Sequence, residues 1–266
     1  MRTETFDMPS GAKLEFRALT IRDENRLASS RGKSMEKTLN RVISDCTVTV
    51  VDPGPYSHLS AGGSVDWNKM LQGDRFVAMF LLRLLSYKDG DEYAFKAQCP
   101  ACNRREFQTI NLRDELPIQD LTDEARETFK NGGLFSVTVD GKEVKFRLPL
   151  VEDTHRLEKM TEQNPDRDMA VAMRLRIKEV EGLEASEILD WLDGGKTGDP
   201  LPSQEAEVLR EAFDEVDCGI DTDVEIQCRC GAFFDVSLPF DAAFFLPSRA
   251  KGKQKQKVGR RLGLGS

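Results

Sequence analysis

The chain has 266 residues, of which 39% are hydrophobic and 32% charged, and its formal net charge is −8. This length allows one or two packed domains, and the composition is typical of a soluble globular protein. The longest apolar run, residues 76–85, contains Arg83 and is too short to cross a bilayer, which argues against a membrane partner.

The charge is unevenly distributed along the chain. Seven of the 38 basic residues and none of the 46 acidic ones lie beyond Pro247, so residues 1–248 carry −15. An acidic body argues against nucleic acid as a partner. The segment 248–266 is expected to be a flexible basic tail, and it either keeps the protein soluble or docks on an acidic partner surface or on nucleic acid. Its candidate partner-binding residues are Arg249, Lys251, Lys253, Lys255, Lys257, Arg260 and Arg261.

Residues 1–90 are predicted to form an extended lead-in followed by a helical region. Residues 13–19 alternate like a strand, and Thr20 can cap a helix that begins after it. Residues 34–46 carry apolar side chains at helical spacing, and residues 74–86 are apolar on nearly all sides. The second of these helices is therefore predicted to be buried.

Two close cysteine pairs are the most informative motif. Cys99 and Cys102 interrupt one strand-like run, and Cys228 and Cys230 interrupt another. A strand, a turn with two sulfurs and a returning strand is how a zinc ribbon presents its ligands, and structural zinc prefers four tetrahedral thiolates. The 125 residues between Cys102 and Cys228 predict a structural Zn²⁺ that joins distant parts of one fold.

Other interpretations of these cysteines remain open. An iron–sulfur cluster also accepts four cysteines and is the less favoured cofactor. A disulfide is disfavoured because residues 1–7 contain no apolar secretory region and a reducing compartment is expected. The pairs can also arise by chance. Cys46 is interpreted as a core residue, and Cys218 has no partner nearby in the sequence.

The remaining segments predict an α+β fold. Residues 134–139 and 143–148 are expected to form a hairpin across Asp140-Gly141. Helices are expected at about 165–180, 185–192 and 203–216. We therefore predict an N-terminal helical region (1–90), a zinc-ribbon-like β-hairpin sheet (91–150 and 218–247) and an inserted helical block (151–217).

No set of catalytic residues can be assembled from the sequence, and no enzyme activity is expected. The two histidines, His58 and His155, lie in no catalytic motif. The stretch Gly194-Gly-Lys-Thr197 lacks the first glycine and the preceding strand of a phosphate-binding loop, so it is interpreted as the end of a helix.

The end of the acidic body is rich in phenylalanine. Phe234 and Phe240 are expected in the core. Phe244 and Phe245, which precede the basic tail, are candidate partner-binding residues because aromatic side chains often anchor interfaces.

The order of several short motifs resembles a known family. The N-terminal half has Met8-Pro-Ser-Gly11, Asp23-Glu24, Gln72-Gly-Asp74, Leu85-Ser-Tyr87 and Cys99-Pro-Ala-Cys102 followed by Ile110-Asn-Leu112; later come Phe146-Arg-Leu-Pro149 and residues 224–231. This order is similar to that of the baseplate (hub) assembly proteins of contractile-tailed bacteriophages, the T-even-like baseplate family. The similarity is strongest over residues 8–115 and weaker over 135–247.

The resemblance implies a non-enzymatic structural or assembly role in a phage tail baseplate. Its partners would be other baseplate and tail proteins, and its location the virion or, during assembly, the host cytoplasm. Whether such a protein stays in the particle or acts as an assembly chaperone is left open. The alternative is a zinc-ribbon adaptor that binds nucleic acid or the transcription machinery, which the cysteines and the basic tail suggest.

Overall fold

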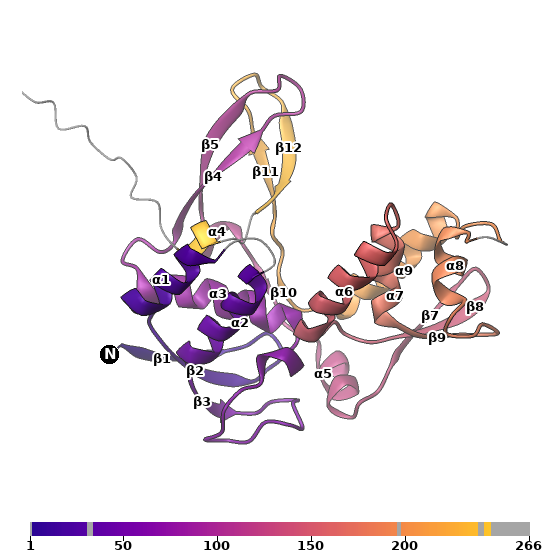
Figure 1. The fold of residues 1–266 in the computed structure, drawn as a ribbon, viewed down its shortest axis with the longest axis horizontal. Helices are drawn as coiled ribbons and strands as arrows, with labels where there is room; N and C mark the ends of the chain where they lie inside the picture. The colour runs from indigo at the N-terminus through magenta and orange to yellow at the C-terminus, as the bar shows by residue number, and fades with distance from the viewer. Residues whose placement is uncertain (1, 31–33, 196–197, 239–241, 246–266) are drawn as a thin grey trace, which may run out of the picture.

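The computed structural model describes residues 2–30, 34–195, 198–238 and 242–245. It divides into a body, a projecting arm and a lobe (Figure 1). Helices and strands alternate irregularly along the chain and most sheets are small antiparallel units, in agreement with the predicted α+β class. None of the described helices is long and apolar enough to span a membrane.

The body is a three-stranded sheet covered by helices. The sheet has the order β1-β2-β3, and all its pairs are antiparallel. The predicted helix after Thr20 is confirmed, because Thr20 and Asp23 form a capping box at its start. The elements of the body are β1 (Thr3–Asp7), β2 (Lys13–Arg17), α1 (Ile21–Ser29), α2 (Ser34–Cys46), β3 (Thr47–Asp52), the 3₁₀ turn η1 (Trp67–Lys69) and α3 (Gln72–Ser86).

Helix α3 is the centre of the body. Ten of its fifteen residues are buried, including Asp74, Arg75 and Arg83, which confirms the predicted buried helix. A helix that is apolar on nearly all sides has to be covered on all sides. Strand β2, helix α2, the short strand β10 (Gly219–Ile220) and the terminal helix α10 (Ala242–Phe245) lie against it.

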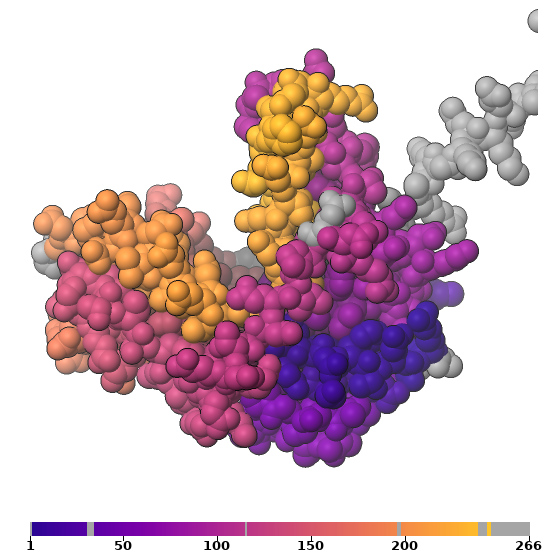
Figure 2. Space-filling model, turned by 180° about the vertical axis from the view of Figure 1, so that it is seen from behind, coloured from indigo at the N-terminus to yellow at the C-terminus, as the bar shows by residue number. Residues whose placement is uncertain are grey.

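The arm consists of two hairpins from distant parts of the sequence. β4 (Glu92–Gln98) pairs with β5 (Arg105–Asn111), and β11 (Asp223–Gln227) pairs with β12 (Phe233–Ser237). Buried and exposed residues alternate along β4 and β11, as expected when one face of each hairpin packs on the other. Figure 2 shows the arm standing clear of the lobe.

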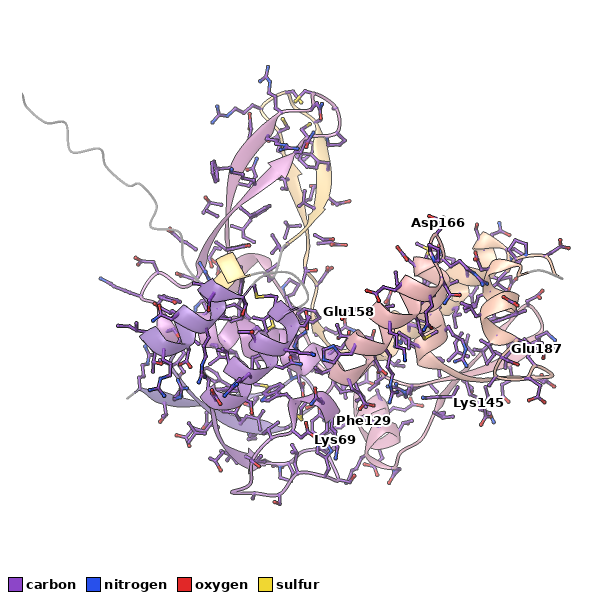
Figure 3. All side chains as sticks on the ribbon, in the orientation of Figure 1. Lys69, Phe129, Lys145, Glu158, Asp166 and Glu187 are labelled. Atoms are coloured by element: carbon purple, nitrogen blue, oxygen red, sulfur yellow. The ribbon has the colours of Figure 1, made fainter. Side chains whose placement is uncertain are left out.

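Short elements join the body to the lobe. They are α4 (Leu112–Glu115), β6 (Ile118–Gln119) and α5 (Asp123–Lys130), and β6 pairs with β10. Phe129 of α5 meets the ring of Tyr56 edge-on, with centroids 5.4 Å apart. Figure 3 shows Phe129 and Lys69 near this boundary, while Lys145, Asp166 and Glu187 lie out on the lobe.

The lobe has its own sheet and its own core. The sheet has the order β7-β8-β9, and the core includes Val144, Phe146, Ile177, Leu209 and Phe213. Its elements are β7 (Phe135–Val139), β8 (Lys142–Phe146), α6 (Val151–Gln163), α7 (Asp168–Arg176), β9 (Ile177–Val180), α8 (Ile188–Asp193) and α9 (Ser203–Val216).

Two features of the lobe differ from the sequence-based expectation. The helix predicted at about 165–180 does not include residues 177–180. These residues form strand β9, because they pair with β8. The hairpin β7–β8 therefore belongs to the same sheet and core as the helical block, and the prediction that it lies with the cysteine hairpins is wrong. This pairing joins residues about thirty positions apart, and no local pattern specifies it.

Candidate functional site

The tip of the arm brings the four predicted cysteine ligands together. Cys99 and Cys228 directly follow strands β4 and β11, and Cys102 and Cys230 lie in the turns beyond them. Each turn is closed by backbone hydrogen bonds, from Cys99 N to Arg104 O at 2.9 Å and from Cys228 N to Ala232 O at 2.9 Å. The hairpins thus fix the positions of all four thiols.

The spacing of the sulfurs fits a single tetrahedral ion. All four Sγ atoms lie within 4.8 Å of one another, with Cys99 and Cys230 at 3.8 Å and Cys102 and Cys228 at 3.6 Å. Sulfurs at about 2.3 Å from a central zinc are about 3.8 Å apart in a regular tetrahedron. A disulfide would need about 2.05 Å, so neither cross-hairpin pair is bonded. The four cysteines could therefore hold a metal ion.

The local environment lowers the pKa of one thiol of the cluster and raises that of another. The backbone N–H of Cys102, followed by that of Ala101, donates to the Cys99 sulfur, and the pKa of Cys99 is lowered to about 7. At Cys228 the backbone N–H of Cys230 also lowers the pKa, but burial and the neighbouring cysteine side chains outweigh it and raise the pKa to about 12. Cys99 and Cys228 are buried between the hairpins, while Cys230 is exposed at the tip. A low thiol pKa favours metal binding because the thiolate is the ligand.

The other two cysteines lie in the body, away from the cluster. Cys46 is fully buried in the core, and burial raises the pKa of its thiol to about 12. Cys218 lies beside Gly73, and burial raises the pKa of its thiol as well. Cys46 is thus the core residue that the sequence predicted, and Cys218, which the sequence left open as a substitute ligand, is not part of the cluster.

The structure places Phe244 and Phe245 inside the core instead of on a partner surface. Both side chains are fully buried, and Phe244 meets the ring of Tyr93 edge-on at 5.2 Å. Arg83 donates to the backbone oxygens of Phe244 and Glu92. In this chain the two phenylalanines hold α10 against α3 and the base of the arm.

Part of the predicted partner surface lies outside the described residues. This holds for Phe240 and for Arg249, Lys251, Lys253, Lys255, Lys257, Arg260 and Arg261. Phe234, which was expected in the core, is partly buried and packs against it.

The two histidines and the glycine-rich turn lie at three separate places in the fold. His58 is exposed, and His155 lies 3.9 Å from Glu158 on the same helix. Gly194 caps the end of α8 in a left-handed conformation with φ 82°, which confirms that this stretch ends a helix.

Motifs that are distant in the sequence meet around the start of α3. Asp74 is fully buried and accepts hydrogen bonds from Ser10 N at 3.0 Å, Ser10 Oγ at 2.6 Å and Tyr56 Oη at 2.6 Å. The hydroxyl of Tyr56 accepts in turn from Leu71 N at 3.1 Å. The N-terminal turn and the start of α3 are therefore joined by one buried carboxylate, and no pattern in the sequence singles out Tyr56 for this position.

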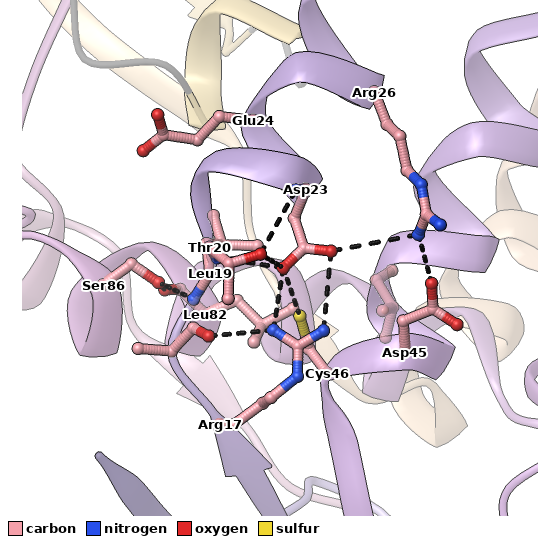
Figure 4. Close-up of polar contacts among 12 residues, drawn as sticks. Arg17, Leu19, Thr20, Asp23, Glu24, Arg26, Asp45, Cys46, Leu82 and Ser86 are labelled. Atoms are coloured by element: carbon pink, nitrogen blue, oxygen red, sulfur yellow. Dashed lines mark hydrogen bonds and ion pairs between the residues drawn. The ribbon is translucent and has the colours of Figure 1, made fainter. Parts of the chain in front are cut away.

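A second buried carboxylate, Asp23, organises the start of α1 (Figure 4). It accepts from Arg17 at 2.7 Å and from Thr20 N at 2.9 Å. Burial opposes ionisation of Asp23, but the hydrogen bonds from Arg17 and Thr20 outweigh it and lower the pKa of this carboxyl. The neighbouring Glu24 accepts from Tyr87 Oη at 2.7 Å. The Asp-Glu motif thus fixes α1 on β2 and α3.

A cleft of about 550 Å³ lies where α3, β10 and the end of α9 meet. Its lining includes Asp214, Asp217, Asp221 and Asp223. Arg176 binds Asp217 at 2.7 Å from the lobe side.

Comparisons with known proteins give one match. A family model described as T4 bacteriophage base plate protein matches residues 1–246, which include the body, the arm and the lobe. No curated protein and no solved structure matches the chain.

Proposed function

The chain belongs to the T4 bacteriophage base plate protein family, and on that premise we propose that it is a non-enzymatic component of a contractile-tail baseplate, in the hub or in its assembly. The match over residues 1–246 is the observation that carries this proposal. It acts through contacts with other tail proteins. The alternative of a nucleic-acid adaptor is not favoured, because residues 1–248 carry −15.

Deletion of the gene in its phage tests this function. Tails without this protein should stop at an incomplete baseplate, while heads are still made. Normal yields of infectious particles from the deletion phage would reject the baseplate role. Detection of the protein in purified particles would assign it to the virion, and detection in assembly intermediates alone would assign it to a chaperone role.

The cysteine cluster is proposed to hold one structural zinc ion. The tetrahedral spacing of the four sulfurs supports this, and a multi-iron cluster would need them farther apart because it fills the space between them. Elemental analysis of protein purified under reducing conditions should give one zinc per chain. The Cys102→Ser variant should lose the metal and unfold at a lower temperature. The control variant Cys46→Ser should keep the metal and lose on the order of 1–3 kcal/mol for burying a hydroxyl.

The basic tail is proposed to dock on an acidic surface of a tail protein. The family match ends at residue 246, before the tail begins, and all seven of its charges are positive. A chain truncated after residue 248 should fold normally yet enter baseplates less efficiently. A truncated chain that is incorporated at the wild-type level would leave the tail only its solubilising role.

A further inference from the structure

The two outer faces of the arm carry opposite charges. The inner faces of the hairpins are buried against each other and their cysteines converge, so the outer faces point in opposite directions. The outer face of β4–β5 has Glu92 at its base, and nearer the tip it presents Lys96, Arg105 and Phe107, which we call the basic face. The outer face of β11–β12 presents Glu225, Phe233 and Asp235, which we call the acidic face.

Each face exposes a large aromatic side chain. Phe107 is 73% exposed and Phe233 is 61% exposed, the second and fourth most exposed large hydrophobic side chains of the described residues. Residues at the base of the same hairpins, such as Tyr93 and Val224, are buried. Exposed aromatic residues beside charges are typical of interface anchors.

The charges of both faces lack partners of opposite sign. Within the described part of the chain, Lys96, Arg105, Glu225 and Asp235 form no ion pair; Lys96 lies over the ring of Phe107 at 5.1 Å. Glu225 and Asp235 are directly opposite each other in the β11–β12 register. Like charges in opposite positions destabilise a strand pair, and a cation placed between them would relieve this repulsion.

The cross-strand residue pairs of the two faces can be compared at equal distances from the cysteines, and each such distance is called a level. At the level next to the cysteines, Gln98 and Arg105 form a pair on the basic face, and Gln227 and Phe233 form a pair on the acidic face. One level closer to the body, Lys96 pairs with Phe107 and Glu225 pairs with Asp235.

Two arms that lie side by side and point in the same direction would therefore place Arg105 on the ring of Phe233. The same arrangement places Lys96 between Glu225 and Asp235. Both contacts are favourable, the first as a cation–π contact and the second as an ion pair.

We propose that the basic face of one arm binds the acidic face of the arm of a second copy of this chain. The two faces differ, so the contact is head-to-tail and repeats around a rotation axis to form a ring of arms. A single hairpin face is small compared with a stable protein interface, and the association is therefore weak between free chains. This self-association goes beyond the proposed function, because it needs only copies of this chain and no other tail protein.

Charge reversal tests this contact. The variant K96E reverses the charge that meets Glu225 and Asp235, and E225K/D235K reverses the acidic face. Each should weaken self-association by about tenfold or more, because like charges would then meet. The chain that carries all three substitutions should associate again, since the charges at this level are complementary with exchanged signs while Arg105 and Phe233 are unchanged. All three side chains are exposed, and circular dichroism checks that the folds are unchanged.

Association is measured by sedimentation velocity at low ionic strength and protein concentrations on the order of 0.1 mM, because small interfaces are weak. A zero-length carbodiimide cross-link in a mixture of ¹⁴N- and ¹⁵N-labelled chains identifies the contact. It should join Lys96 of one chain to Glu225 or Asp235 of another. A wild-type chain that remains monomeric, or a chain with K96E, E225K and D235K together that fails to associate, overturns the proposal. Either result leaves the deletion test of the baseplate function unaffected.

Discussion

At the residue scale, two buried carboxylates explain why several short motifs are arranged in this order. Asp74 joins Ser10 and Tyr56, and Asp23 joins Arg17 and Thr20. The partners of Asp74 are up to 64 positions away in the sequence. Hydrogen bonds to a charged group contribute about 1.5–3 kcal/mol each, provided that the group is buried and its other partners are in place. The buried hydrogen bonds within the fold therefore account for these motifs without any contact to a partner protein.

The hydroxyl of Tyr56 is expected to stabilise the body strongly. Tyr56→Phe removes the donor to Asp74 and leaves Leu71 N–H without its acceptor. We expect a loss of about 2–4 kcal/mol in the free energy of unfolding, measured by urea denaturation.

Tyr87→Phe is the matched control, because its hydroxyl donates to Glu24 at 2.7 Å at a partly exposed site. That variant should lose about 1 kcal/mol or less. Equal losses for the two variants would contradict the role of burial.

Asp74 should make stability depend on pH in the acid range. Burial raises the pKa of Asp74 above its usual 3.8, although Ser10 and Tyr56 oppose the shift. The unfolded chain therefore releases this proton at lower pH than the folded chain. Stability from this group is complete below the unfolded pKa and is lost as the pH rises through the folded pKa.

The Asp74→Asn variant isolates this dependence, because an amide has no proton to release there. The stability of the wild type relative to Asp74→Asn should fall as the pH rises from about 3.8 and become constant above the folded pKa. Urea denaturation of both proteins over this pH interval provides the measurement. A relative stability that increases with pH would contradict the raised pKa.

At the element scale, the contact between α3 and β10 depends on a glycine. A Cβ atom on Gly73 would lie 2.0 Å from the backbone oxygen of Cys218, far inside any real contact. Gly73→Ala must therefore push β10 away from α3, and we expect a loss of about 3 kcal/mol or more.

Gly198→Ala is the control for this prediction, because nothing lies within 4 Å of the added Cβ atom. It should change the free energy of unfolding by less than about 0.5 kcal/mol. Thermal unfolding of both variants gives the comparison. A Gly73→Ala variant as stable as the control would contradict the close approach of the two elements.

Elements with a clear local signal were predictable from the sequence, and elements set by distant partners were not. The bounds of α2 and α9 agree with the predicted Ser34–Cys46 and Ser203–Val216, because both have helical periodicity. Residues 177–180 follow a helix without a break, and only their pairing with β8 makes them a strand. The burial of Phe244 likewise depends on Tyr93 and Arg83, which lie 150 or more residues earlier.

The same distinction between local sequence patterns and contacts of distant residues applies to the candidate site. The four cysteines were predictable because their spacing is itself a motif, and the structure brings all four together. The exposure of Phe107 and Phe233 was not predictable, because the sequence does not show which side of each hairpin packs inward.

At the scale of the whole molecule, two hydrophobic cores separate the lobe from the body. Leu209 is fully buried in the lobe core, and Leu39 is buried in the body core. A Leu→Ala change in either core should cost about 2–5 kcal/mol. Leu209→Ala should raise amide hydrogen exchange in β7–β9 and α9 while α3 stays protected. Leu39→Ala should do the reverse, and uniform deprotection by either variant would show one cooperative core instead of two.

The closure of the arm has a consequence for the order in which the protein folds during synthesis. Cys228 is made 126 residues after Cys102, a delay of about 6–25 s at typical translation rates. During that interval Tyr93 and Phe95, on the inner face of the first hairpin, have no second hairpin to cover them. The arm is thus among the last parts of the fold to form, and its completion marks a chain whose translation has passed strand β11.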